Sequence, residues 1–453
     1  MQLAYKLKKP GNGWMYNRRS YKQIEMEQIK KGKKSCSSHG GASSTVLSPF
    51  LRGNGGLFSV LAAACFIGYA GQVCAVDASP AGAPAARTPL ESFSENAYIK
   101  DRLAVHVEHN YFDWHDDTNR SGRQNITPVT LTYSYNNLDF GLRRALIEST
   151  NTSPGREGSV ATWSDTSLSA SYTLKNLSWP VRFSLDYNLP SGKATLSGSE
   201  KNAIMDGSLV QQTRFGEGEN ITPGIGVTHA FGEKDVFGAG LSFSKRGAFD
   251  PNGDVINDEI DPGDETIATM QWQHGEEKWL VIGGLIYTNS GVTQRGGLDY
   301  YKKGDRYDAN VTGIVALPSE QRLQASLRYS TQRPDQYINN IIGRLQQESA
   351  NSNGDSTYLN LDWGKTWHGA HTFHAIADYL EIRANSYDQI NDLYNAGRVK
   401  TSFGIGYDYA ISRNGSVSVQ AKQFEMTDRA TPATLRDTRY RGNGVYLNLN
   451  HSF

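Results

Sequence analysis

Apolar and polar side chains alternate along most of the chain after residue 98, with a period of two. In the stretch 179–189, Trp179, Phe183 and Leu185 share one parity, and Arg182 and Asp186 have the other. Because successive side chains of a β-strand point to opposite faces, this period predicts strands with one apolar and one polar face. No run of 18 apolar residues and no helix-rich segment follows residue 75, so the predicted class is all-β.

The alternation predicts about sixteen strands, with fourteen as the alternative because the stretches 138–148 and 266–274 are the least regular. The predicted strands are residues 100–113, 125–136, 138–148, 163–174, 179–189, 224–231, 236–244, 266–274, 277–288, 304–317, 322–331, 356–367, 371–384, 398–410, 416–427 and 444–453. Short turns alternate with long polar connections, as in a transmembrane antiparallel up-and-down β-barrel with both ends on the inner side of the membrane. A soluble sandwich or propeller is the rival, but it would not place Tyr and Trp repeatedly at strand ends.

The first 98 residues are predicted to lie outside the barrel, which would occupy 99–453. A basic stretch precedes the apolar run 57–69, which predicts a targeting pre-sequence over 1–75 with cleavage after Ala75. A lipoprotein site at Cys65 is the alternative, and Met15 and Met26 are alternative starts. Residues 76–98 are rich in Ala and Pro and predict a periplasmic lead-in without a core.

Composition narrows the function further. The three cysteines all lie in 1–75, so the rest of the chain can form no disulfide or thiolate site. Residues 1–75 hold 11 of the 46 Lys and Arg residues and 2 of the 46 Asp and Glu residues. The remainder therefore carries 35 basic and 44 acidic groups, a net charge of −9, which gives no electrostatic support for nucleic-acid binding. The mean hydropathy of −0.54 does not argue against a barrel, which spreads its apolar residues over alternate positions.

The polar parity of the strands predicts which side chains line the barrel interior. The predicted inward charged residues are Arg143, Arg182, Asp186, Arg328, Asp362, His374 and Asp378. Inward charges in a barrel pair with one another and stiffen it, or they bind a polar solute. The same parity also carries an apolar set, namely Leu280, Ile282, Ile286, Ile376, Leu380 and Ile382. Because water is not left against such a surface, a folded-in loop or an apolar ligand is predicted to cover it.

Two loops are candidates for that cover. In the loop after Thr331, Ile338, Ile341, Ile342 and Leu345 fall at helical spacing within 335–347, which predicts an amphipathic plug. The long loop 190–222 carries a second apolar set, Met205, Leu209, Val210 and Phe215. These residues either pack the loops together as a lid or form an entrance for hydrophobic molecules.

The loop 250–265 is densely acidic and begins like a calcium-binding loop. Its candidate ligands are Asp250, Asn252, Asp254, Asp258 and Asp261, which supply the hard oxygens that Ca²⁺ prefers. Val255 stands where an EF-hand needs Gly, and Asp261 stands where it needs Glu. The loop is therefore a candidate for a looser Ca²⁺ site, for bridging to lipopolysaccharide through divalent ions, or for a solvated surface without metal. No other cofactor is predicted.

No enzymatic activity is predicted. The cluster Trp114-His115-Asp116-Asp117 is the one that invites comparison with outer-membrane hydrolases, and no nucleophile accompanies it.

The chain ends on Phe453, and the last strand places Val445, Leu447 and Leu449 on the same face as this residue. An aromatic end of this kind predicts the signal read by the barrel assembly machinery of a Gram-negative outer membrane. Deletion of Phe453 is expected to slow insertion of the barrel, measured as the rate at which the folded, heat-modifiable form appears. Normal insertion of the deletion variant would count heavily against this signal.

Three segments resemble the fatty-acid transporter superfamily of outer-membrane proteins, in particular the phenol-degradation meta-pathway transporters. They are Leu185-Asp-Tyr-Asn-Leu-Pro-Ser-Gly192, Phe215-Gly-Glu-Gly-Glu-Asn-Ile-Thr-Pro-Gly224 and the acidic loop at 250. The resemblance implies a barrel that passes hydrophobic or aromatic compounds, whereas the family's amino-terminal plug sequence is not found here. The predicted function is a passive or gated outer-membrane channel for small hydrophobic or amphipathic molecules, surrounded by lipid and lipopolysaccharide. A scaffold barrel around a periplasmic electron-transfer or export partner, and a general porin, are the alternatives.

Overall fold

A computed structural model describes residues 101–453 apart from 257, 340 and 433. The predicted pre-sequence 1–75 and the lead-in 76–98 lie outside the described residues. No helix in the described part of the chain is long and apolar enough to cross a membrane.

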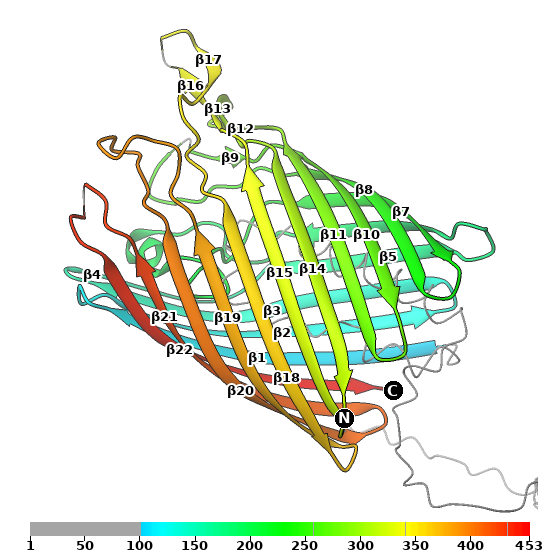
Figure 1. Ribbon diagram of the computed structural model, residues 1–453. Helices are drawn as coiled ribbons and strands as arrows, with labels where there is room; N and C mark the ends of the chain where they lie inside the picture. The colour runs from blue at the N-terminus through cyan, green and yellow to red at the C-terminus, as the bar shows by residue number, and fades with distance from the viewer. Residues whose placement is uncertain (1–100, 257, 340, 433) are drawn as a thin grey trace, which may run out of the picture. The chain divides into compact units, whose positions relative to one another are not determined.

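The strands form a closed antiparallel barrel in which each pairs with the barrel strands before and after it, except that β4 and β5 both pair with β3 (Figure 1). They are β1 (Asp101–Asp116), β2 (Ser121–Tyr135), β3 (Leu138–Ser153), β4 (Arg156–Trp163), β5 (Thr166–Leu174), β6 (Val181–Leu189), β7 (Asn220–Phe231), β8 (Asp235–Arg246), β10 (Glu265–Gly275), β11 (Trp279–Ser290), β14 (Arg306–Leu317), β15 (Gln321–Gln332), β18 (Ser356–Trp367), β19 (His371–Ile382), β20 (Arg398–Ser412), β21 (Gly415–Asp428) and β22 (Thr438–Ser452). Pairing of β1 with β22 closes the barrel.

The strand number of sixteen is confirmed. Segments β4 and β5 both pair with β3 and act as one strand interrupted at residues 164–165. Each of the sixteen predicted stretches overlaps a barrel strand, including the two least regular ones. The first two outer connections differ from the prediction, because residues 117–120 and 154–155 are tight turns and not long loops.

Apolar side chains cover the outer face, and aromatic residues mark both of its edges. Trp279 and Tyr287 lie on the outer face of β11 and bound a segment of nine residues, 279–287, which is about the length of strand that crosses a membrane. Near the short turns, the rings of Trp179 and His229 stack with centroids 4.4 Å apart. Near the long loops, the hydroxyl of Tyr329 donates to Asp355 at 2.8 Å. Two such girdles are typical of transmembrane barrels.

The start of β1 and the end of β22 both lie at the end of the barrel that carries the short turns. The backbone N–H of Phe453 donates to the carbonyl of Leu103 at 2.9 Å, so the terminal residue is joined to β1. The Phe453 side chain is largely exposed, and its role as an assembly signal stays a prediction.

The outer loops form a second, smaller sheet from β9 (Ile260–Asp261), β12 (Val292–Arg295), β13 (Leu298–Lys302), β16 (Gln336–Asn339) and β17 (Arg344–Gln347). Figure 1 shows the β16–β17 hairpin beyond the end of β15. The connection from β6 to β7, residues 190–219, contributes no strand to this second sheet, and we call it the inner loop. It contains a short 3-10 helix, η2 (Gly198–Ala203).

Candidate functional site

The inner loop packs its apolar side chains against the inner wall of the barrel. Met205, Leu209, Val210 and Phe215 are at most 5% exposed. They share one buried cluster with inward-facing residues of β1 to β4, β21 and β22, which include Phe112, Trp114, Ile126, Ile147, Val160, Phe424, Met426, Tyr440 and Tyr446. Burial of one such side chain contributes roughly 1.5–3 kcal/mol, so four of them hold the loop firmly against the wall.

Polar contacts hold the same loop on the side of β20. Nη1 of Arg398 lies 2.7 Å from Oδ1 of Asp206 and also donates to the hydroxyl of Ser208 at 2.8 Å. Nζ of Lys400 donates to the carbonyl of Ser208 at 2.5 Å. Two inward cations from one strand therefore hold residues 206–208 of the loop.

Further hydrogen bonds hold the loop on the side of β2 and β3. The amide of Gln124 donates to the carbonyl of Gln212 at 2.8 Å and accepts from the backbone N–H of Gln212 at 2.9 Å. The hydroxyl of Ser149 donates to the carbonyl of Ala203 at 2.9 Å. Because β22 pairs with β1, the inner loop thus contacts one continuous arc of the barrel wall, from β20 through β22 and β1 to β4.

The ion pair between Asp206 and Arg398 makes this attachment sensitive to acid. Partial burial would raise the pKa of the Asp206 carboxyl, but the Arg398 guanidinium and hydrogen bonds from Arg398 and Ser208 hold the pKa below its usual value of 3.8. A carboxyl whose pKa is lowered in the folded state stabilises that state above its unfolded pKa. This stabilisation is lost as the pH falls through the folded pKa.

We therefore expect the attachment of the inner loop to be constant from neutral pH down to about pH 5 and to weaken below about pH 4. Protease cleavage of the loop in the folded barrel, followed against pH, measures this change. The Asp206→Asn variant should hold the loop less firmly at neutral pH and respond less to acid. A wild-type pH profile in that variant would show that another group is responsible.

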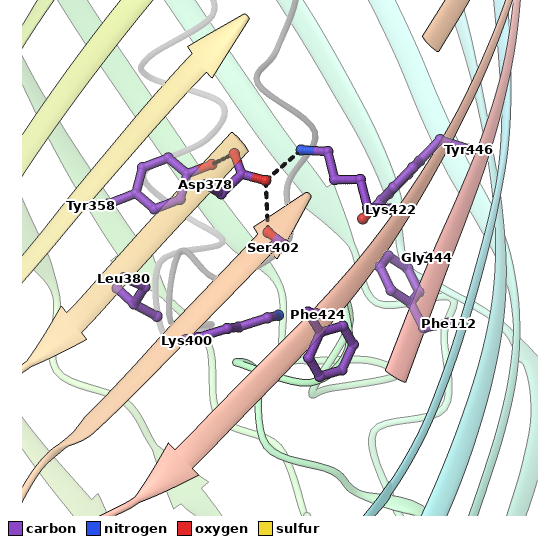
Figure 2. Close-up of a pocket in the computed structure, with 10 residues that line it drawn as sticks. All are labelled: Phe112, Tyr358, Asp378, Leu380, Lys400, Ser402, Lys422, Phe424, Gly444 and Tyr446. Carbon is purple, nitrogen blue, oxygen red and sulfur yellow. Dashed lines mark hydrogen bonds and ion pairs between the residues drawn. The ribbon is translucent and has the colours of Figure 1, made fainter. Parts of the chain in front are cut away.

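A pocket lies in the inner wall beside the inner loop. Six strands line it, in the half of the barrel nearest the long loops. The lining residues, drawn in Figure 2, are Phe112, Tyr358, Asp378, Leu380, Lys400, Ser402, Lys422, Phe424, Gly444 and Tyr446. We call this space the wall pocket.

Asp378 is the one carboxylate of the wall pocket, and four donors satisfy it. Its Oδ1 accepts from the Tyr358 hydroxyl at 2.9 Å and from the Asn360 amide at 2.7 Å. Its Oδ2 accepts from the Ser402 hydroxyl at 2.9 Å and from Nζ of Lys422 at 2.7 Å (Figure 2). The charges of Asp378 and Lys422 therefore neutralise each other.

Most of the other charged residues predicted to face inward pair along the wall. Nη2 of Arg328 on β15 lies 2.9 Å from Asp308 on the neighbouring β14. Nη2 of Arg182 lies 3.2 Å from Asp139. The described contacts join strands that lie next to each other or one strand apart, so these pairs stiffen the wall and do not cross the lumen.

His374 lies between two carboxylates on the inner wall. Its Nδ1 is 2.8 Å from Asp362 and its Nε2 is 3.1 Å from Asp408, which joins β18, β19 and β20. Asp186 lies on the inner face of β6 beside Arg182, and Arg143 lies exposed on the inner face of β3. The structure does not bring the predicted charged residues together into one site.

The predicted apolar lining divides into two separate sets. Ile282 and Ile286 are buried and Leu280 is half-buried on β11, whereas Ile376 and Leu380 are buried on β19. The strands β14, β15 and β18 lie between β11 and β19. Of these residues, Leu380 lines the wall pocket.

The predicted helical plug at 335–347 is wrong. The strands β16 and β17 form an outer hairpin, in which Ile338 pairs with Leu345. Ile341 and Ile342 lie in the turn and are 93% and 58% exposed. The apolar spacing that imitated a helix arises from one cross-strand pair and two turn residues, so these four side chains do not cover the lumen.

The acidic loop makes contacts with cationic side chains. Nζ of Lys201 lies 2.6 Å from Asp254 and 2.9 Å from the Asn252 amide oxygen. Arg295 lies 3.4 Å from Asp258. Over residues 101–453, leaving out the three undescribed positions, no group of three or more His, Cys, Asp or Glu side chains is arranged to hold a metal ion. The predicted Ca²⁺ site, which also includes Asp250 and Asp261, stays a prediction.

Sequence reasoning missed the two lysines and the aromatic residues of the wall pocket. Lys400 and Ser402 share the inward parity of β20, and Lys422 and Phe424 share that of β21. The available signal for this pocket was an inward cation two positions from an inward aromatic residue. Strand parity alone, however, does not reveal that a loop covers these side chains.

No protein-family model matches the chain, and no curated protein matches it. Among solved structures, a Pseudomonas aeruginosa FadL homologue is similar, with 9% identity, a TM-score of 0.39, and coverage of 80% of this chain and 94% of that one. The CymD monoaromatic hydrocarbon channel has 10% identity, a TM-score of 0.37, and coverage of 78% and 88%. Acinetobacter baumannii OccAB4 has 6% identity, a TM-score of 0.40, and coverage of 79% and 100%.

Proposed function

We propose that this chain is an outer-membrane channel for passive passage of small molecules, and that the inner loop is its gate. The observation that carries the proposal is the docking of residues 190–219 on the inner wall of a closed barrel whose outer face is apolar. A scaffold sleeve is expected to have a wide polar lumen free of such a loop, and a general porin is expected to have an open, charged constriction. We further propose that the solutes are hydrophobic or amphipathic, because aromatic and aliphatic side chains dominate the wall pocket.

Swelling of proteoliposomes in a series of neutral solutes of increasing size tests the channel. The wild-type chain should admit small solutes faster than liposomes without protein do, and it should exclude larger ones that a general porin admits. Rapid entry of all solutes would favour the general porin. No entry by the wild-type chain and by a variant without the inner loop would favour the scaffold barrel.

A further inference from the structure

The wall pocket carries an excess positive charge on Lys400. Lys422 and Asp378 form an ion pair at 2.7 Å, which leaves Lys400 as the remaining charged group of the lining. In the described part of the chain, the contacts of its ammonium group are the Ser208 carbonyl at 2.5 Å and the Phe424 ring, whose centroid lies 4.1 Å away. A carbonyl and a ring face carry only partial charges, so the described contacts of Lys400 include no carboxylate, and Asp378 and Asp206 act on its charge only from a longer distance.

The rest of the lining favours a flat apolar group. The rings of Phe112 and Tyr446 meet edge to face with centroids 5.5 Å apart. Phe424 and Leu380 add further apolar surface on either side of Lys400 (Figure 2). Aromatic walls of this kind pack well against another ring.

We propose that the wall pocket binds an amphipathic monoanion, an aromatic carboxylate, on its path through the channel. Its charge would pair with the ammonium group of Lys400, and its ring would pack against Phe424, Phe112 and Tyr446. Asp378 faces the same space, but it already accepts four hydrogen bonds from neighbouring residues of the wall. It therefore repels the anion less than a carboxylate without such donors would. This inference rests on the proposed function, because it names the solute that the channel selects.

Equilibrium binding of radiolabelled benzoate to the folded full chain in detergent tests the inference. The Lys400→Met variant should bind benzoate about tenfold more weakly or worse, because a charge-assisted contact is lost. Lys400→Arg keeps the positive charge and should bind far better than Lys400→Met. Lys234→Met removes the same charge at a short turn, where Lys234 pairs with Glu276 at 2.6 Å, and should bind like the wild type. The heat-modifiable electrophoretic form confirms that each variant is folded.

Competition with unlabelled compounds shows whether binding requires the negative charge and the ring of the ligand. Unlabelled benzoate should displace the probe, whereas acetate, which lacks the ring, and benzylammonium, which has the opposite charge, should not. Equal competition by acetate or by benzylammonium, wild-type affinity of Lys400→Met, or no binding of benzoate would overturn the inference. If neutral solutes pass but benzoate does not bind, the proposed channel function holds and the inference about its ligand fails. If benzoate binds but no solute passes, the ligand site holds and the proposed channel function fails.

Discussion

Excision of most of the inner loop is expected to raise the flux of small solutes through the barrel several-fold. The structure indicates where to cut, because the backbone N–H of Lys193 donates to the carbonyl of Phe215 at 3.2 Å. Residues 194–214 can therefore be replaced by two glycines. The Asp165 carboxylate accepts from the backbone N–H groups of Gly192 and Glu217, both at 2.7 Å, and keeps the cut ends in place.

The outer hairpin offers a matched control for this excision. The backbone N–H of Glu348 donates to the carbonyl of Asp335 at 3.0 Å, so residues 336–347 can be replaced by two glycines in the same way. Because Ile341 and Ile342 at its tip are exposed, this excision should leave proteoliposome swelling unchanged. An increase of flux with the hairpin excision, and none with the inner-loop excision, would show that the gate has been assigned to the wrong loop.

Substitution of Gly158 by Ala is expected to displace the inner loop from the wall. Gly158 lies on β4 beneath η2, and an added Cβ would lie 2.3 Å from the backbone nitrogen of Ala203 and from the carbonyl carbon of Asn202. Backbone atoms cannot rotate away as a side chain can, so the helix turn must move. Overpacking of this kind costs about 1–3 kcal/mol, which raises the detached fraction of the loop by roughly 5- to 150-fold.

Labelling of a single cysteine measures that detachment. Val210→Cys places a thiol at a position that is 1% exposed, in a chain whose own cysteines all precede residue 75. In this background Gly158→Ala should speed maleimide labelling at least several-fold. Gly313→Ala is the control, since nothing lies within 4 Å of its added Cβ. Equal labelling rates in the two glycine variants would show that η2 is not held against β4.

The sequence predicted the barrel well because strand alternation is a local property. Each strand carries its own apolar and polar faces, so sixteen strands and the inward parity of residues such as Asp362 and Leu380 follow without knowledge of the fold. The outer ends of β1 to β4 were missed for a related reason. They extend beyond the apolar band as polar strands joined by tight turns, and polar residues there look like loop.

The placement of the loops could not be predicted in the same way. The apolar sets at 205–215 and at 338–345 look equally suited to cover a lumen, yet one is buried on the wall and the other is an exposed hairpin. The two loops differ in the tertiary contacts that they make. Gly158 leaves room for η2, and Arg398 and Lys400 meet the 206–208 segment from about 190 residues away in sequence. Such contacts depend on barrel closure and leave no local pattern.

Single-channel recording in planar bilayers, with the wild-type chain and the inner-loop excision compared at one voltage, tests the gate most directly. If the inner loop gates the lumen, the wild-type chain should show small, brief openings and the excision variant should show larger, steady openings. The same large, steady conductance in both proteins would contradict it, because residues 190–219 would then leave the path for ions open.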